Sequence, residues 1–141
     1  MMCMRLIHSA KNRGGFMKII IANISDMPIY QQIKDQIKDA IFRNDLNEGE
    51  LLPSIRALAN DLRVSVLTTR RVYDELELEG FVTSKAGKGT FVATENLELL
   101  RESKRHMVEV KLTEAWETAN SLGITKNELY SMMDLLFEEE D

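Results

Sequence analysis

Apolar residues in the first half of the chain recur at the spacing of one helix face. Ile29, Ile33, Ile37 and Ile41 return every fourth residue, so they fall along a single stripe of a helix. The pattern predicts a helix that begins beside Pro28, since proline is tolerated in a first helical turn. The polar residues between the isoleucines are expected to face water: Lys34, Asp35, Lys38 and Asp39.

Two shorter helices and a hairpin are predicted in the middle of the chain. Ser54 is a favoured N-cap residue, and the apolar positions after it predict a helix that ends at Leu62. Ser65 caps a second helix, which extends to Glu79 with its apolar positions on one face. Two short apolar runs then flank a glycine-containing loop within residues 81–92, which predicts a two-stranded β-hairpin.

Residues 95–141 are predicted to form a helical hairpin. Gly123 ends its first helix, and Thr125 with Glu128 forms the sequence signature of a capping box for the second. The tail contains no larger domain against which the hairpin could bury its apolar stripes. We therefore expect these stripes to pack on the same hairpin of a second copy. The residues expected in this dimer interface are Leu100, Met107, Val108, Leu112, Ala115, Trp116, Ala119, Leu129, Met132, Met133 and Leu136.

The first 16 residues show no hydrophobic periodicity. We interpret residues 1–16 as a disordered extension, or as sequence upstream of a natural translation start at Met17. They lack the apolar core and the cleavage site of a signal peptide. The β-branched run at residues 18–22 predicts one strand.

The net charge of −5 is distributed unevenly along the chain. Residues 1–26 carry +3, residues 27–94 carry −1 and residues 95–141 carry −7. The acidity therefore lies in the C-terminal tail, while residues 56–88 hold six cations. Because the local field at a contact surface decides whether phosphates bind, an acidic chain can still present a nucleic-acid surface.

Several kinds of chemistry have no support in the sequence. Cys3 is the only cysteine, so no internal disulfide can form, and neither His8 nor His106 has the spacing of a metal ligand. No nucleophile–base pair or paired-carboxylate motif indicates an enzyme. No apolar run reaches the length of a membrane span. We therefore expect a cytoplasmic protein without catalytic residues, bound metal or cofactor.

Three motifs follow one another between Leu52 and Val92. They are Leu52-Pro53-Ser54-x-Arg56-x-Leu58-Ala59, Arg70-x-x-Tyr73-x-x-Leu76-x-x-x-Gly80 and Gly87-Lys88-Gly89-Thr90-Phe91-Val92. At these motifs the chain resembles the DNA-binding domain of the GntR family of transcription regulators, and its start and short tail look like the YtrA subfamily. The resemblance implies a winged helix-turn-helix over residues 17–94. The expected fold is then mainly α with a small β-hairpin and a short C-terminal α-helical dimerisation hairpin over residues 95–141.

The resemblance also implies which residues contact DNA. They are Arg56, Ser65, Thr68, Arg70, Gly87, Lys88 and Gly89. Arg71, the neighbouring cation on the same predicted helix, is a further candidate. Val66 stands where some members have a polar or basic residue, and Arg63 replaces the common turn glycine. The operator sequence therefore does not follow from the motif.

Three functions are compatible with these observations. The first is a repressor that binds double-stranded DNA at a palindromic operator as a homodimer, without a membrane partner. A small-molecule effector could act through the tail, although no residue pattern indicates one. The second is a winged-helix protein-interaction module that does not bind DNA specifically, and the third is a small enzyme. Salt-sensitive DNA binding separates the first function from the other two.

Overall fold

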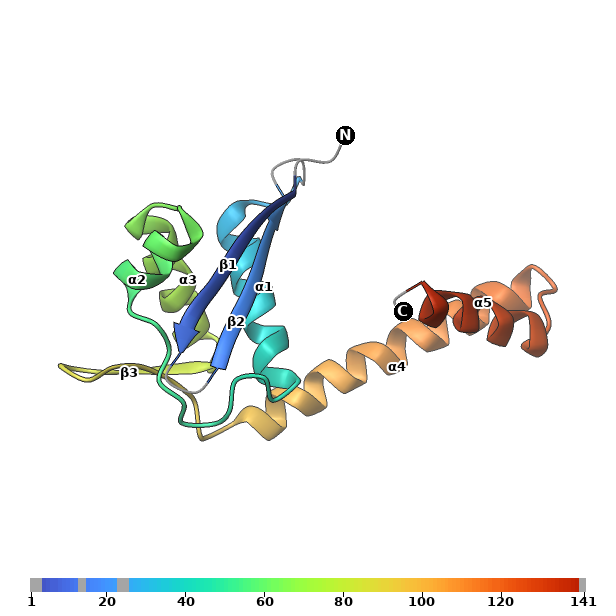
Figure 1. Ribbon diagram of the computed structural model, residues 1–141. Helices are drawn as coiled ribbons and strands as arrows, with labels where there is room; N and C mark the ends of the chain where they lie inside the picture. The colour runs from blue at the N-terminus through green and yellow to red at the C-terminus, as the bar shows by residue number, and fades with distance from the viewer. Residues whose placement is uncertain (1–3, 13–14, 23–25, 140–141) are drawn as a thin grey trace. The chain divides into compact units, whose positions relative to one another are not determined.

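The computed structural model describes residues 4–12, 15–22 and 26–139 (Figure 1). The chain divides into two compact units, Met1–Glu98 and Leu99–Asp141. Among the described residues, the first unit contains two β-hairpins, three helices and the start of a fourth, and the second contains the rest of that helix and a fifth. The mainly α fold with a small wing hairpin, expected from the sequence, is confirmed.

Three helices build the core of the first unit: α1 (Ile29–Phe42), α2 (Ile55–Leu62) and α3 (Val66–Leu78). Both α1 and α2 pack against α3. Their apolar stripes meet in a core whose fully buried side chains include Ile33, Ile37, Ile41, Leu58, Leu62, Thr69, Val72 and Leu76. The predicted helices are thereby confirmed, because the buried residues fall on the faces that their spacing indicated.

Two residues of α1 differ from the prediction. Ile29 is 41% exposed, because it lies at the helix end beside Leu67 and Arg71 of α3 rather than over the core. Lys34, which was expected to face water, is only 7% exposed. Its ammonium group lies between the carboxylates of Glu75 in α3 and of Glu79, the C-cap residue of that helix, and buried charges require such partners.

Strands β1 (Met4–Asn12) and β2 (Gly15–Ala22) form an antiparallel hairpin against α1 and α2 (Figure 1). Side-chain amides of α1 bind the backbone of β2. Gln36 exchanges two hydrogen bonds with Ile20, at 2.8 and 2.6 Å, and Gln32 binds the last residue of β2 in the same way. Each amide supplies a donor and an acceptor, so it satisfies two backbone groups at once.

This hairpin changes the interpretation of the N-terminal segment. The strand predicted at residues 18–22 is confirmed as part of β2. Residues 4–12, for which the sequence predicts disorder, form β1 instead, because a strand edge offers backbone donors and acceptors to a neighbouring segment. A translation start at Met17 stays a prediction, and residues 1–3 lie outside the described residues.

The wing consists of β3 (Val82–Lys85) and β4 (Gly89–Val92), paired antiparallel as predicted. The extended segment before α2 pairs with the other edge of β4, where the N–H of Leu52 donates to the carbonyl of Thr90 at 2.8 Å. The base of the wing is therefore fixed to the entrance of α2, while its tip projects away from the core.

The tail consists of α4 (Leu97–Ser121), which begins in the first unit, and α5 (Lys126–Glu138). The predicted capping box is present. The N–H of Thr125 donates to the Glu128 carboxylate at 2.8 Å, and the N–H of Glu128 donates to the Thr125 hydroxyl at 3.2 Å. No helix among the described residues has the length and apolar character needed to cross a bilayer.

The tail leaves much of its apolar surface uncovered. Trp116 is 58% exposed, and large side chains on both helices share this exposure: Met107, Val108, Leu112, Met132 and Leu136. Leu100, Leu129 and Met133 are half-buried and Ala115 is exposed. Ala119 is buried within the unit itself, so it offers no surface to a partner, contrary to its expected interface role. An apolar face of this kind marks an interaction surface.

Candidate nucleic-acid interface

A serine caps the N-terminus of each of the two helices α2 and α3. The Ser54 hydroxyl accepts a hydrogen bond from the N–H of Ala57 at 3.1 Å, and the Ser65 hydroxyl accepts one from the N–H of Thr68 at 3.1 Å. Between them Arg63 adopts a left-handed conformation, with φ 54° and ψ 45°. This conformation ends α2 and directs the chain into α3 within two residues.

Buried polar contacts fix α3 against the start of α2. The Tyr73 hydroxyl donates to the Pro53 carbonyl at 2.7 Å, and the Thr69 hydroxyl donates to the Ile55 carbonyl at 3.0 Å. Burial also raises the pKa of Tyr73 far above its ordinary value, so the hydroxyl keeps its proton. These bonds determine which face of α3 is turned outward.

Cations on three elements have no ion-pair or hydrogen-bond partner within the described parts of the chain. Arg56 lies in the first turn of α2, Arg70 lies on the outer face of α3, and Lys88 lies at the tip of the wing. All three side chains are exposed. Unpaired, exposed guanidinium and ammonium groups are available to phosphate oxygens, and an arginine can also bind a guanine edge bidentately.

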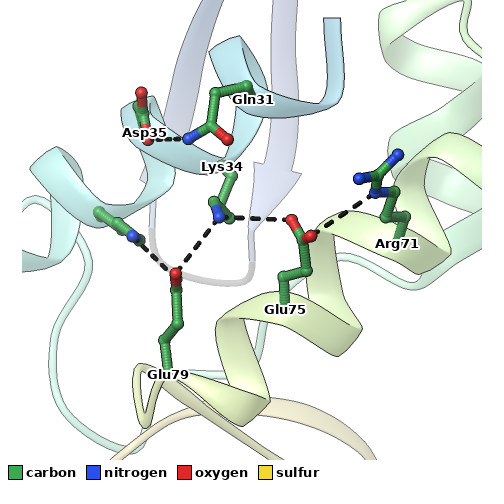
Figure 2. A network of polar contacts seen from close by, with 7 residues as sticks. Gln31, Lys34, Asp35, Arg71, Glu75 and Glu79 are labelled. Atoms are coloured by element: carbon green, nitrogen blue, oxygen red, sulfur yellow. Dashed lines mark hydrogen bonds and ion pairs between the residues drawn. The ribbon is translucent and has the colours of Figure 1, made fainter. Parts of the chain in front are cut away.

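Arg71 differs from Arg70 because protein groups already hold it. Its guanidinium lies 3.5 Å from the ring centroid of Tyr30, and its Nε lies 3.6 Å from the Glu75 carboxylate (Figure 2). Stacking and ion pairing fix the guanidinium plane, and the ion pair uses only Nε, so the two terminal nitrogens point to no partner among the described residues. Arg71 can thus offer a positioned contact at the α1–α3 surface.

An ion-pair network, in which only Lys34 is buried, connects α1 to α3 and its C-cap residue Glu79 (Figure 2). Lys34 Nζ lies 3.3 Å from both Glu75 and Glu79, and Lys38 Nζ lies 2.8 Å from Glu79. Burial alone would lower the pKa of Lys34, but the contacts with Glu79 and Glu75 outweigh it and raise that pKa. Burial would raise the pKa of Glu79, but Lys38 and Lys34 hold it below its ordinary value.

The hydroxyls of Ser65 and Thr68 lie together at the start of α3. Their oxygens are 2.8 Å apart, so one donates to the other. Ser65 is exposed and Thr68 is half-buried. The helix dipole makes this end of α3 favourable for anions, and both hydroxyls retain lone pairs or a proton for a phosphate or base edge.

The wing tip combines glycines with lysines. Gly87 and Gly89 have φ of 72° and 118°, a conformation that L residues rarely adopt. No atom would meet a Cβ at Gly87 within 4 Å, so the glycine is needed for the turn and not for internal packing. Lys85 lies over the Phe91 ring at 4.9 Å and stiffens the hairpin, whereas Lys88 remains free at the tip.

The expected contact residues all lie in the first unit, which also shows two features that sequence reasoning missed. The stacking of Tyr30 on Arg71 and the ion pairs of Lys34 both depend on how α1 lies against α3. Within the described residues, no group of His, Cys, Asp or Glu could hold a metal ion.

The geometry agrees with comparisons to known proteins. The model of the family "Bacterial regulatory proteins, gntR family" matches residues 29–92. YhcF of Bacillus subtilis, described as an uncharacterized HTH-type transcriptional regulator, is 38% identical over 105 residues, which cover 74% of this chain and 86% of YhcF. The HTH-type transcriptional repressor YtrA of the same organism is 31% identical over 106 residues, which cover 75% of this chain and 82% of YtrA.

A solved structure extends the likeness to the fold. YtrA from Sulfolobus acidocaldarius, described as a GntR-family transcription factor, is 36% identical, with a TM-score of 0.54. The match covers 72% of this chain and 97% of that one. Since the relatives align beyond the winged unit and over most of their own length, the chain belongs to the gntR family of bacterial regulatory proteins, with YtrA proteins among its relatives.

Proposed function

We propose that this DNA-binding transcription regulator acts as a repressor, occupying a palindromic operator as a homodimer in the cytoplasm. Membership of the family supports transcription regulation. A relative that is 31% identical is described as a transcriptional repressor, which supports the sign of the effect. The single observation that carries the proposal is the set of exposed, unpaired cations on α2, α3 and the wing.

In the proposed complex, each of these cations meets a different part of the duplex. Arg70 and the N-terminal hydroxyls of Ser65 and Thr68 are carried by α3, the helix that enters the major groove. Arg56 at the start of α2 reaches the phosphates that flank the groove. Lys88 and the glycine-containing tip of the wing reach the DNA sugar–phosphate backbone beyond that groove. Arg71, already fixed by Tyr30, adds a phosphate contact that needs little ordering.

A homodimer follows from the uncovered apolar face of the tail. The exposed side chains on α4 and α5 would otherwise remain in water, which is unfavourable for large apolar groups. The same face on a second copy has matching chemistry, and a two-fold axis then presents two winged units to two half-sites about one helical turn apart. Repression follows sterically, because the bound dimer blocks access to the promoter.

In vitro selection of bound duplexes with the full-length chain, followed by a salt titration, tests the proposal. The selected sites should be palindromic, and the logarithm of the binding constant should fall steeply with the logarithm of salt concentration. Arg56→Ala or Arg70→Ala should lower the magnitude of that slope by about 2, because a dimer loses two phosphate contacts. Arg43→Ala, at the far end of α1, should leave it unchanged.

The alternative of a winged-helix protein-interaction module gives a different result. Such a module would show no salt-sensitive binding to any duplex, and neither arginine substitution would change its association with DNA. A transcription assay on the selected operator distinguishes a repressor from an activator. The purified protein should reduce the transcript yield. A rise in yield would reverse the proposed sign of regulation.

A further inference from the structure

Leu67 occupies an unusual place for an apolar side chain. It is 78% exposed in the first turn of α3, two residues before the fully buried Thr69. Because successive residues of an α-helix are rotated by about 100°, a two-residue separation places Leu67 on the side opposite the core. Its exposure therefore follows from the helix register, and no packing role within the first unit accounts for a leucine there.

The surroundings of Leu67 are partly apolar and partly cationic. With Ile29, Tyr30, Thr68 and Arg71 it lines a shallow depression of about 380 Å³ between the starts of α1 and α3. Ile29 is also exposed, so the depression has an apolar floor. The Arg71 guanidinium, held by Tyr30 and Glu75, and the Thr68 hydroxyl lie at its polar edge.

This combination matches one feature of a DNA major groove. Thymine presents a C5 methyl group there, and that methyl is the only apolar group any base pair displays in the groove. The phosphate linked to the same nucleotide lies close to it and needs a cation or a hydroxyl donor. An apolar side chain with an arginine and a threonine beside it supplies complementary groups for both.

We propose that Leu67 determines operator specificity by contacting the C5 methyl group of thymine. The proposal rests on the DNA-binding function inferred above and identifies the base that this position of α3 reads. Arg70 and Arg56 supply the electrostatic attraction, while Leu67 distinguishes thymine from the other bases at one position of each half-site.

Replacing thymine by deoxyuridine in the selected operator provides the test, because the two bases pair identically and differ only in the methyl group. With the full-length protein, at least one thymine per half-site should show about fourfold weaker binding after single replacement. Leu67→Ala should bind the thymine and deoxyuridine duplexes equally. Its salt dependence should match that of the unmodified protein, since no charge is lost.

Leu78→Ala is the matched control. Leu78 is 88% exposed on the same helix, three turns from its N-terminus, so this substitution should keep the full response to deoxyuridine. The proposal is overturned if no thymine replacement weakens binding, if Leu67→Ala keeps the response, or if the selected sites lack thymine under α3. In each of these cases the protein would still bind DNA in a salt-sensitive way, so the proposed DNA-binding function would stand. If the protein bound no duplex in a salt-sensitive way, the DNA-binding function would be overturned as well.

Discussion

The hydroxyl of Tyr73 on α3 donates a 2.7 Å hydrogen bond to the carbonyl oxygen of Pro53, the residue before the cap of α2. The bond is buried and joins two elements that both carry DNA-contact candidates. It therefore sets the position of Arg56 on α2 relative to Arg70 on α3. Interfaces with duplex DNA require such fixed spacing, because phosphates lie at regular intervals along the groove.

Tyr73→Phe should lower the free energy of unfolding by about 1–3 kcal/mol, because it leaves the buried Pro53 carbonyl without its donor. Urea unfolding followed by circular dichroism measures the change. Tyr30→Phe is the control, since the Tyr30 hydroxyl makes no hydrogen bond within the described residues and its ring can still stack on Arg71. Equal stability of the Tyr73 variant and the unmodified protein would show that the hydrogen bond contributes nothing.

The ion pairs between α1 and α3 predict a dependence of stability on pH. The pKa of Glu79 is lower in the folded chain than its ordinary value of 4.5, so the unfolded chain binds more protons in this range. The stabilisation by Glu79 is therefore fully present above about pH 4.5 and is lost as pH falls through the lower, folded pKa. Lys34, whose pKa is raised, contributes below its ordinary value of 10.5 and loses its contribution at higher pH.

Glu79→Gln should therefore be less stable than the unmodified protein at pH 7, and the difference should shrink as the pH is lowered below 4.5. Urea midpoints measured between pH 7 and pH 3 report this convergence. Asp74→Asn, an exposed substitution on the same helix, should show no such trend. A stability gap for the Glu79 variant that stays constant over the whole range would contradict the assigned role.

The helices of the winged unit were predictable because local signals determine them. Ser54 and Ser65 are caps that need only the next few residues, and the isoleucine stripe of α1 needs only its own spacing. The ion pairs of Lys34 were not predictable, because they depend on residues of α3 more than forty positions away. Strand β1 was missed for a similar reason, since its partner β2 gives it order that its own residues do not indicate.

The contact residues were only partly predictable. Motif spacing placed Arg56 and Arg70 on α2 and α3, but it gave Arg71 only as a further candidate and did not indicate what holds its side chain. The environments of Arg70 and Arg71 differ because Tyr30 of α1 lies under the guanidinium of Arg71 and not under the other. The expected dimer residues illustrate the same limit, since they included both Ala119 and Trp116 although Ala119 is buried and Trp116 is exposed.

Arg63→Gly should raise the free energy of unfolding by about 1 kcal/mol. Arg63 holds φ at 54° in the turn between α2 and α3, where a side chain with a Cβ is strained and glycine is not. The substitution costs no internal contact, because the Arg63 side chain is exposed and unpaired in the described parts of the chain. Thermal unfolding should show a higher midpoint. Arg63→Ala, which keeps the strain, should not, and a rise for alanine alone would refute the backbone explanation.

Trp116→Glu should convert the protein to a monomer. Trp116 is 58% exposed on α4 among other uncovered apolar side chains, and a carboxylate inserted there would be buried without a partner in the proposed dimer. Light scattering coupled to size-exclusion chromatography should give the mass of one chain, at a concentration where the unmodified protein gives that of two.

Operator affinity should fall by about a hundredfold or more with this variant, because two linked winged units no longer bind together. Glu117→Gln, the exposed neighbour on α4, should keep both the dimer and the affinity. A Trp116→Glu protein that remains dimeric would place the interface elsewhere. A monomeric protein with unchanged operator affinity would instead show that the two winged units bind DNA independently.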